Sequence, residues 1–285
     1  MNKITIVGLV ICMLVVPSYI SVAQVTDNHE STIIQDDDVP IWNSKDSWTF
    51  SISEFTVDYN YESTKILMNG KIDDFKWTVS DTSGSTYKVD VTGKVIASFE
   101  AALPFGGTVI NVEGDIKPNL NKITGTIIFT KSNLEIEDFN AVIKGVASIA
   151  IQPLPIKLPI PIRISVNSVL STIFPLLQFP LHTLKFWNMP EMDIKMNIKF
   201  GGIFGIIKIP ITFTTHYSFV PLAFSCLSME SVTVPEGTYD AWRIKSLIGD
   251  FFEYYYAPEV GNLIKIDVNM PRGDVHGELI DTNYA

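Results

Sequence analysis

The sequence feature that most constrains the fold is the stretch at residues 231–268, where short alternating segments are separated by turn signals. Residues 235–237 read Pro-Glu-Gly, in which proline presets φ for a tight turn and glycine completes it. Five of the six residues at 251–256 are aromatic, which favours a strand. Farther on, Ile264 and Ile266 alternate with charged or polar neighbours. This pattern predicts a meander of antiparallel strands with one apolar face.

The same period of two recurs through most of the chain. In residues 87–91, aromatic and aliphatic side chains alternate with charged ones, and residues 192–200 give the cleanest example of such a strand. Turn signals such as Gly201-Gly202 separate the segments. We therefore expect an all-β protein built on an antiparallel curved sheet, or half-barrel, and not on βαβ units.

The middle of the chain departs from this pattern. Prolines at positions 153, 155, 159 and 161 alternate with apolar residues, and proline cannot donate to a central ladder, so we expect an extended strap there. Residues 165–178 carry apolar side chains at helical spacing, which predicts a short amphipathic helix that covers the sheet. The residues on its apolar side are Val166, Val169, Leu170, Ile173 and Leu177. Residues 164–184 hold no formal charge, but the prolines at 175 and 180 make a membrane span the poorer alternative.

These segments divide the chain into five parts. They are a signal peptide at 1–23, a flexible acidic leader at 24–39, an N-terminal antiparallel β unit at 40–150, the strap and covering helix at 151–179, and a C-terminal antiparallel β unit at 180–285. The strand pattern of each β unit begins with a tryptophan, Trp48 or Trp187. Each tryptophan follows a proline, with a short polar segment between the two. The two units are either related half-units or segments that are alike by chance, and the sequence leaves both open.

The first 23 residues have the features of a secretory signal. Lys3 gives a positive start, residues 4–16 are apolar, Pro17 ends the run, and residues 21–23 suit a cleavage site. The apolar run is shorter than the roughly 20 residues that a membrane-spanning helix needs. We expect an extracytoplasmic protein, secreted or associated with the cell envelope, with an uncleaved anchor as the alternative.

Charge and cysteine content narrow the choice of partners. The formal net charge is −10, which gives the chain no electrostatic reason to bind nucleic acid or anionic lipid. Cys12 lies in the signal, so Cys226 is the only cysteine left after cleavage, and no intramolecular disulfide can form. Its apolar sequence context predicts a buried, inert thiol.

Signatures of catalysis, cofactors or structural metals are missing from the sequence. There is no His-Glu-x-x-His, Gly-x-Ser-x-Gly, Cys-x-x-Cys or P-loop pattern, and the acidic triplet at 36–38 lacks the spacing of a calcium loop. Glu253, among aromatic residues, is either an acid with a raised pKa or a carboxylate that points to water. We expect a non-enzymatic protein without cofactor or metal, with a hydrolase whose site is assembled only in space as the alternative.

Two quoted segments carry a family resemblance. Residues 232–242 read VTVPEGTYDAW and residues 254–265 read YYYAPEVGNLIK. Together they resemble the closing segment of secreted proteins of unassigned function, which in turn are similar to the lipoprotein-carrier (LolA/LolB-like) fold. The resemblance implies an incomplete antiparallel barrel whose hollow is covered by a short helix and binds acyl chains. It brings no catalytic residue.

A curved apolar sheet beneath an apolar cover predicts either an ordinary packed core or a cavity for a hydrophobic ligand. For the cavity, the expected lining residues are Met192, Met196, Phe200, Tyr254 and Tyr256. The expected capping residues are Leu170, Ile173, Phe174 and Leu177. We thus expect a secreted binding protein whose partner is a hydrophobic small molecule or acyl chain, with peripheral contact with the cell envelope as a further candidate. The alternative is a structural or adhesive cell-surface β-protein without a small ligand.

Overall fold

The computed structural model describes residues 39–284, with internal gaps. The gaps fall at residues 62–63, 106–107, 118–121, 152–156, 170–174, 190–191, 201–211, 220–221, 248–250 and 271–272. Everything below concerns the described residues. The predicted signal peptide, residues 1–23, and nearly all of the predicted leader, residues 24–39, lie outside them.

Every regular element in the described part of the chain is a β-strand, which confirms the all-β prediction. The strands are β1 (Ser47–Tyr61), β2 (Thr64–Asp81), β3 (Thr86–Phe105), β4 (Thr108–Ile116), β5 (Lys122–Thr130), β6 (Ile136–Ile151), β7 (Lys157–Val169), β8 (Lys185–Met189), β9 (Met192–Phe200), β10 (Thr212–Phe219), β11 (Leu222–Val234), β12 (Gly237–Ser246), β13 (Phe252–Ala257), β14 (Asn262–Met270) and β15 (Gly273–Thr282). The predicted meander at residues 231–268 is formed by the end of β11 together with β12, β13 and β14.

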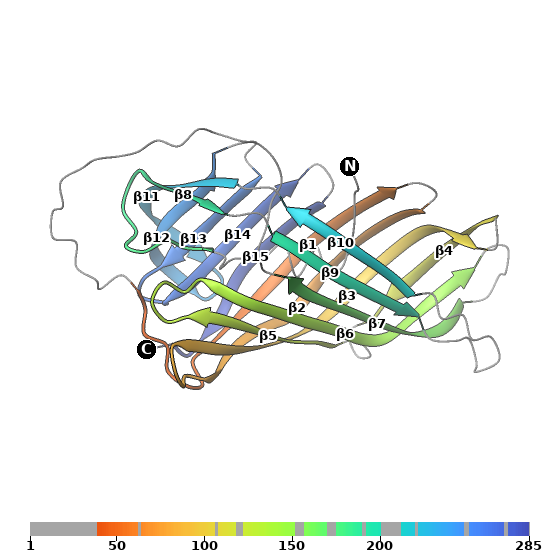
Figure 1. The fold of residues 1–285 in the computed structure, drawn as a ribbon, viewed down its shortest axis with the longest axis horizontal. Coiled ribbons are helices and arrows are strands. Elements are labelled where there is room, and N and C mark those ends of the chain that lie inside the picture. Colours follow the sequence, from red (N-terminus) through yellow and green to blue (C-terminus); the bar gives the residue numbers. More distant parts are fainter. Residues whose placement is uncertain are drawn as a thin grey trace.

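The strands form one antiparallel sheet. Its order is β10-β9-β7-β6-β4-β3-β2-β1-β15-β14-β13-β12-β11-β8, and β5 pairs with β3 and β6. Strands β4 and β5 lie end to end, because β3 pairs with β4 through residues 97–105 and with β5 through residues 86–93. Figure 1 shows β11 to β14 at one end of the molecule and the long strands β2, β3, β6 and β7 reaching toward the other.

The two ends of this strand order are pairs of strands that follow one another in the sequence. Met189 of β8 pairs with Leu222 of β11, and Met192 of β9 pairs with Phe219 of β10. Beyond these pairs, β11 joins β12 and β9 joins β7. Residues 190–191 and 220–221, which lie between the two pairs along the chain, are outside the described residues.

Glycines and register shifts bend the sheet. β1 has register shifts between Thr49 and Phe50 and again beyond Ile52, where β-bulges increase the local twist. At Gly70 an added Cβ would lie 2.6 Å from the ring of Phe55, so the ring occupies the space that a side chain would need. A ring packed over a strand glycine in this way fixes both the bend and the register.

An aromatic cluster joins the start of the chain to the meander. The Trp42 indole nitrogen donates to the Gly261 carbonyl at 2.9 Å, and the Trp48 indole nitrogen donates to the Val260 carbonyl at 2.8 Å. The ring centroids of Trp42 and Trp48 are 4.9 Å apart, and Phe129 packs edge-on against Trp42. The turn between β13 and β14 is thereby held against the first strand of the sheet.

The predicted helix at residues 165–178 is wrong where the structure describes it. Residues 165–169 belong to β7, residues 175–178 are irregular, and residues 170–174 lie outside the described residues. In β7 the buried side chains Ile164 and Val166 alternate with Ser165, so the period there is two and not 3.6. The strong strand preference of β-branched residues agrees with this period.

The predicted strap is also partly a strand. Pro159 and Pro161 lie in β7 opposite Ser148 and Val146 of β6. The described pairing of β7 with β9 begins at Ile162, opposite Phe200. The residues that this register would place opposite Pro159 and Pro161 lie outside the described residues.

Replacing Trp48 with alanine should lower the free energy of unfolding by about 3–5 kcal/mol, the usual range for removing a large buried aromatic side chain. Trp48 is 0% exposed and loses its hydrogen bond to Val260 in this variant. Urea denaturation measures the change. The control is Ile41→Ala, because Ile41 is 76% exposed and should change stability by less than about 0.5 kcal/mol. Equal effects of the two substitutions would contradict the structure.

Candidate functional site

A short irregular segment at residues 175–181 covers part of the sheet. Its apolar side chains Leu176, Leu177, Phe179 and Leu181 are all buried, whereas Gln178 is exposed. The prolines at positions 175 and 180 explain why this apolar segment is neither helix nor strand, since proline removes a donor and restricts the preceding residue. We call residues 175–181 the covering segment.

The covering segment is attached to the sheet by few polar contacts. The Tyr254 hydroxyl donates to the Leu176 carbonyl at 2.7 Å, and the Phe179 ring packs edge-on against Tyr256 with centroids 5.5 Å apart. At the far end of the segment, Lys185 Nζ donates to the Pro180 carbonyl at 2.8 Å. The four apolar side chains of the segment are buried, so the cover that was predicted as a helix is an irregular segment over residues 175–181.

Aromatic side chains from three strands gather in the same region. Phe224 of β11 packs against Trp187 of β8, with ring centroids 6.0 Å apart and nearly parallel planes. It also contacts Tyr254 of β13, with centroids 5.7 Å apart, and Phe252 at 6.3 Å. All four residues are buried. The region is thus an aromatic surface that also contains the hydroxyls of Tyr254 and Tyr256 and the indole nitrogen of Trp187.

Tyr254 and Cys226 of this region are neutral at ordinary pH. Burial raises the pKa of Tyr254 well above its usual value, so its hydroxyl remains a hydrogen-bond donor. Burial also raises the pKa of the Cys226 thiol to about 11, although the charge on Lys185 lowers it slightly. The prediction of a buried, unreactive Cys226 is therefore confirmed, because the thiolate is the reactive form.

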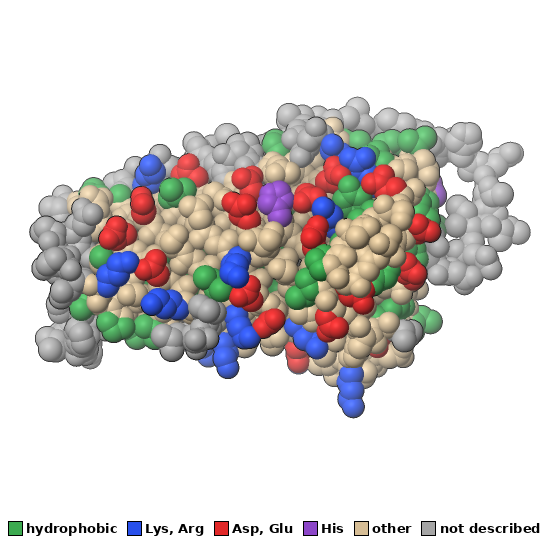
Figure 2. All heavy atoms as spheres, turned by 180° about the vertical axis from the view of Figure 1, so that it is seen from behind, with side chains coloured by type: hydrophobic (Ala, Val, Ile, Leu, Met, Phe, Trp, Pro, Cys, Tyr) green, Lys and Arg blue, Asp and Glu red, His purple; other side chains and the backbone are tan. Residues whose placement is uncertain are grey.

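Strands β12 to β15 carry a group of ion pairs. Arg243 makes two hydrogen bonds to the Glu253 carboxylate, at 3.0 and 3.1 Å. Lys265 pairs with Glu278 at 3.1 Å, and His276 Nδ1 lies 2.9 Å from an Asp267 oxygen. On the face that Figure 2 shows, acidic and basic side chains alternate over the surface with no large area of one sign.

The sequence left two interpretations of Glu253, an acid with a raised pKa or an ordinary carboxylate. Loss of hydration by itself would raise its pKa, but hydrogen bonds from Tyr255 and Arg243 and the charges of Arg243 and Lys245 outweigh this effect. The pKa of Glu253 is therefore lowered, and the group is an ionised ion-pair partner and not a protonated acid.

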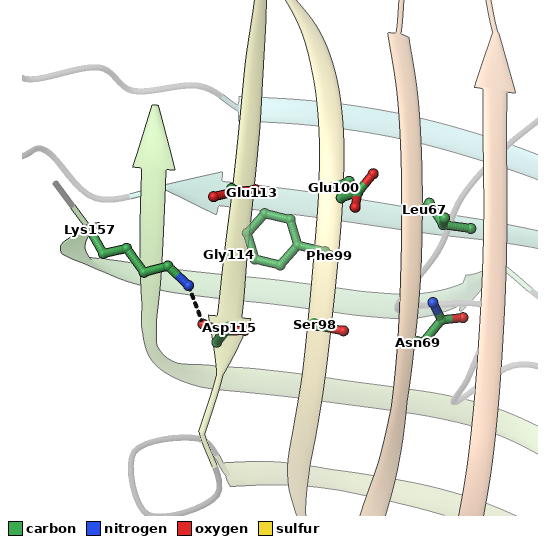
Figure 3. Close-up of a pocket in the computed structure, with 9 residues that line it drawn as sticks. All are labelled: Leu67, Asn69, Ser98, Phe99, Glu100, Glu113, Gly114, Asp115 and Lys157. Atoms are coloured by element: carbon green, nitrogen blue, oxygen red, sulfur yellow. Dashed lines mark hydrogen bonds and ion pairs between the residues drawn. The ribbon is translucent and has the colours of Figure 1, made fainter. Parts of the chain in front are cut away.

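A shallow pocket of about 190 Å³ lies elsewhere, over β2, β3 and β4. Figure 3 shows its mixed lining, in which Leu67 and Phe99 lie among polar side chains and Lys157 pairs with Asp115 at 2.8 Å. Glu100 and Glu113 lie directly opposite each other on β3 and β4. None of the residues that line this pocket belongs to the covering segment.

A second part of the inner apolar surface lies toward the far ends of the long strands. Ile66, Phe99, Val112 and Leu158 pack against the hydrophobic core but remain half-buried. The register aligns Phe99 with Met68 and Gly114, and Gly114 with Ile149. These residues form a second apolar surface, distinct from the covered aromatic region.

Three of the nine predicted site residues meet in the covered region. Leu177 lies in the covering segment, and Tyr254 and Tyr256 lie beneath it, each in contact with that segment or buried near it. Met192, Met196 and Phe200 lie on β9, where the backbone register is described but the side chains are not. Leu170, Ile173 and Phe174 lie outside the described residues.

Sequence reasoning missed Leu176, Phe179, Trp187 and Phe224 as members of this region. Leu176 lies within the predicted helix and Phe179 directly follows it, so both could have been included, because they belong to the same uncharged stretch. Trp187 was read only as the start of a β unit. Its place beside Phe224 depends on the pairing of β8 with β11, for which the sequence has no local signal.

Among the described residues, no group of three or more His, Cys, Asp or Glu side chains is placed to hold a metal ion. The described part of the chain also contains no helix that is long and apolar enough to cross a membrane. No family model, curated protein or solved structure matches the chain.

Replacing Glu253 with glutamine should make unfolding less dependent on pH. A lowered carboxyl pKa stabilises the folded state above the unfolded value near 4.5, and this stability is lost as the pH falls through the lower folded value. Glu253→Gln should thus unfold at lower urea than wild type at about pH 6, and the difference should shrink toward about pH 3. The control Glu259→Gln, at an exposed turn position, should match wild type at both pH values. A difference for Glu253→Gln that stays constant with pH would contradict the ion-pair assignment.

Proposed function

We propose that the protein is a non-enzymatic binding protein that holds a hydrophobic ligand, such as an acyl chain, on the aromatic surface beneath the covering segment. The N-terminal signal pattern supports an extracytoplasmic location, secreted or at the cell envelope. The likeness to lipoprotein carriers stays a prediction that agrees with this proposal.

The observation that carries the proposal is the nature of the cover. An apolar surface inside a curved sheet is covered by an irregular segment, and two side-chain hydrogen bonds run from the sheet to its backbone, from Tyr254 and from Lys185. A strand such as β12 is instead held by backbone ladders to β11 on one side and to β13 on the other. The covering segment is therefore the part of this region that can leave the surface at the lowest cost.

The free energy of burying an acyl chain is similar to that of burying the covering segment, which favours exchange of one for the other. Burying the four apolar side chains of the covering segment contributes about 1.5–3 kcal/mol for each one. An acyl chain contributes about 0.8 kcal/mol for each buried CH₂ group, so about twelve such groups offset the loss of the cover. A ligand of this length can replace the segment with a small net change in free energy.

The chemistry of the region supports binding over catalysis. The Cys226 thiol has a raised pKa, and the Tyr254 hydroxyl is held as a neutral donor. Glu253 is paired with Arg243. None of these groups has the pairing of nucleophile and base that a hydrolase would require.

Native mass spectrometry tests the proposal. The purified protein is examined directly and after incubation with saturated fatty acids of 12 to 18 carbons, and a bound lipid is expected in at least one of these samples. A photoactivatable fatty acid should then label peptides that contain Leu177 or Tyr254. Absence of any bound lipid would end the proposal, and labelling confined to the peptide around Phe99 would move the ligand to the second apolar surface.

A variant that weakens the cover should bind ligand more tightly. Phe179→Ala removes the ring that packs on Tyr256, which destabilises the covered state and should raise the affinity for a fatty acid by about tenfold or more. The matched control is Phe186→Ala, because Phe186 is seven residues away and 57% exposed. Fluorescence titration measures both. Equal affinity of Phe179→Ala and wild type would show that the segment does not compete with ligand.

A further inference from the structure

The register of the sheet brings together basic residues that are far apart in the sequence. Lys122 of β5 lies opposite Lys144 of β6, and Lys144 lies opposite Arg163 of β7. Lys199 of β9 holds the next position, opposite Arg163. Figure 1 shows β6, β7 and β9 side by side. We call Lys122, Lys144 and Arg163 the basic row, which Lys199 continues along the register.

The basic row lies on the outer face of the sheet. Its three residues are exposed, whereas Ile123, Ile143 and Ile162, each next to one of them in the sequence, are buried in the core. Successive side chains of a strand point to opposite faces, so the row points away from the core. Neighbouring strands are about 4.8 Å apart, and the row therefore places one cation on each strand at about this interval.

The strands that carry the basic row contain few acids. There is no Asp or Glu in β5 or β7, and Asp138 of β6 and Asp193 of β9 are each six residues from the row or its continuation. Six residues of strand span about 20 Å, about twice the screening length at 0.1 M salt. On the neighbouring strands, Asp115 is bound by Lys157 and Asp74 by Lys94.

No ion pair found among the described residues includes a member of the basic row. The meander shows the more usual arrangement. Lys265 lies opposite Glu278 and pairs with it at 3.1 Å, and Lys245 lies opposite Glu253 at 3.6 Å. Like charges directly opposite each other destabilise a sheet. The basic row therefore has a cost in stability that an anion bound from outside offsets.

The surroundings of the row indicate which kind of anion fits. The nearby residues Thr124, Ser165 and Asn167 are small and polar, and the aromatic residues of β5 and β6, Phe129 and Phe139, are buried. The described part of this face thus has no aromatic side chain on which a nucleic-acid base could stack. Exposed lysines are flexible point charges, which suit mobile head groups that rearrange to meet them better than an anion of fixed geometry.

We propose that the outer face of β5, β6, β7 and β9 docks the protein on a membrane surface rich in anionic phospholipids, through the basic row. The net charge of −10 gives no reason to expect such contact, but it describes the whole chain and not this face. The inference goes beyond the proposed function, because it concerns the surface at which the protein works and holds whether or not an acyl chain is bound.

Vesicle co-sedimentation tests the docking surface. Wild type should bind vesicles of phosphatidylcholine with one-third phosphatidylglycerol at about 0.05 M salt, and should be released at about 0.5 M salt, where the charges are screened. Vesicles of phosphatidylcholine alone should not bind it. Dextran sulfate serves as a soluble polyanion, and its binding is measured in parallel.

Two double variants locate the contact. Lys122→Gln/Lys144→Gln should weaken binding to the anionic vesicles by about twentyfold or more, at about fivefold for each charge removed. The matched control is Lys71→Gln/Lys88→Gln, which removes the same charge from two exposed strand positions. Lys71 already pairs with Asp73, and Lys88 lies near Asp81, so this control should stay within about twofold of wild type.

Stability provides an independent measurement. Lys144→Gln should unfold at the same or a higher urea concentration than wild type, because it removes repulsion within the row. Lys265→Gln should unfold at a lower concentration, because it removes the pair with Glu278. If Lys144→Gln lowered stability as much as Lys265→Gln, the row would serve the fold itself, and the docking proposal would be wrong.

The other outcomes are equally decisive. Failure of wild type to bind anionic vesicles at low salt would overturn the proposal, as would equal binding to neutral vesicles, which indicates an apolar attachment. Binding of dextran sulfate without binding of vesicles would make the partner a soluble polyanion and the membrane assignment wrong. Lys122→Gln/Lys144→Gln should bind a fatty acid as wild type does, so failure of docking and failure of the proposed function are read separately.

Discussion

Two indole hydrogen bonds join the start of β1 to the turn between β13 and β14. Trp42 reaches Gly261 and Trp48 reaches Val260, which are 219 and 212 residues away in the sequence. Together they fix the turn between β13 and β14 against the beginning of β1, and β15 completes the link by pairing with both β1 and β14. The orientation of β13, and with it the position of Tyr254 beneath the covering segment, depends on this junction.

Much of the fold could be predicted from period-two alternation. Residues 231–268 and 192–200 were expected to be strands and are strands, because alternation matches a pleated element with one buried face. The expected helix at 165–178 failed because its spacing fitted both periods over a few residues. There, β-branched Ile164 and Val166 favoured the strand, and the neighbouring β6 supplied a ladder for it.

The candidate site could be predicted only in part from the sequence. Tyr254 and Tyr256 stood out because aromatics cluster at 251–256, and Leu177 because it belongs to a long uncharged stretch. The contact between Tyr254 and Leu176 joins residues 78 positions apart and has no local signal. The same is true of Trp187, whose unpaired nitrogen becomes visible only when its surroundings are known. The hydrogen bonds of the region thus depend on long-range pairing, which the sequence does not show. Its apolar residues could be predicted from local sequence pattern.

The pairing of β1 with β15 also bears on how the protein is made. Trp48 of β1 has Thr282 of β15 as its neighbour, so β1 keeps one open edge until β15 has been synthesised. Strands with open edges pair readily with other chains, and non-local pairing is slow. Completion of this part of the sheet therefore waits for residues 273–282, and until then the free edge of β1 is open to pairing with other chains.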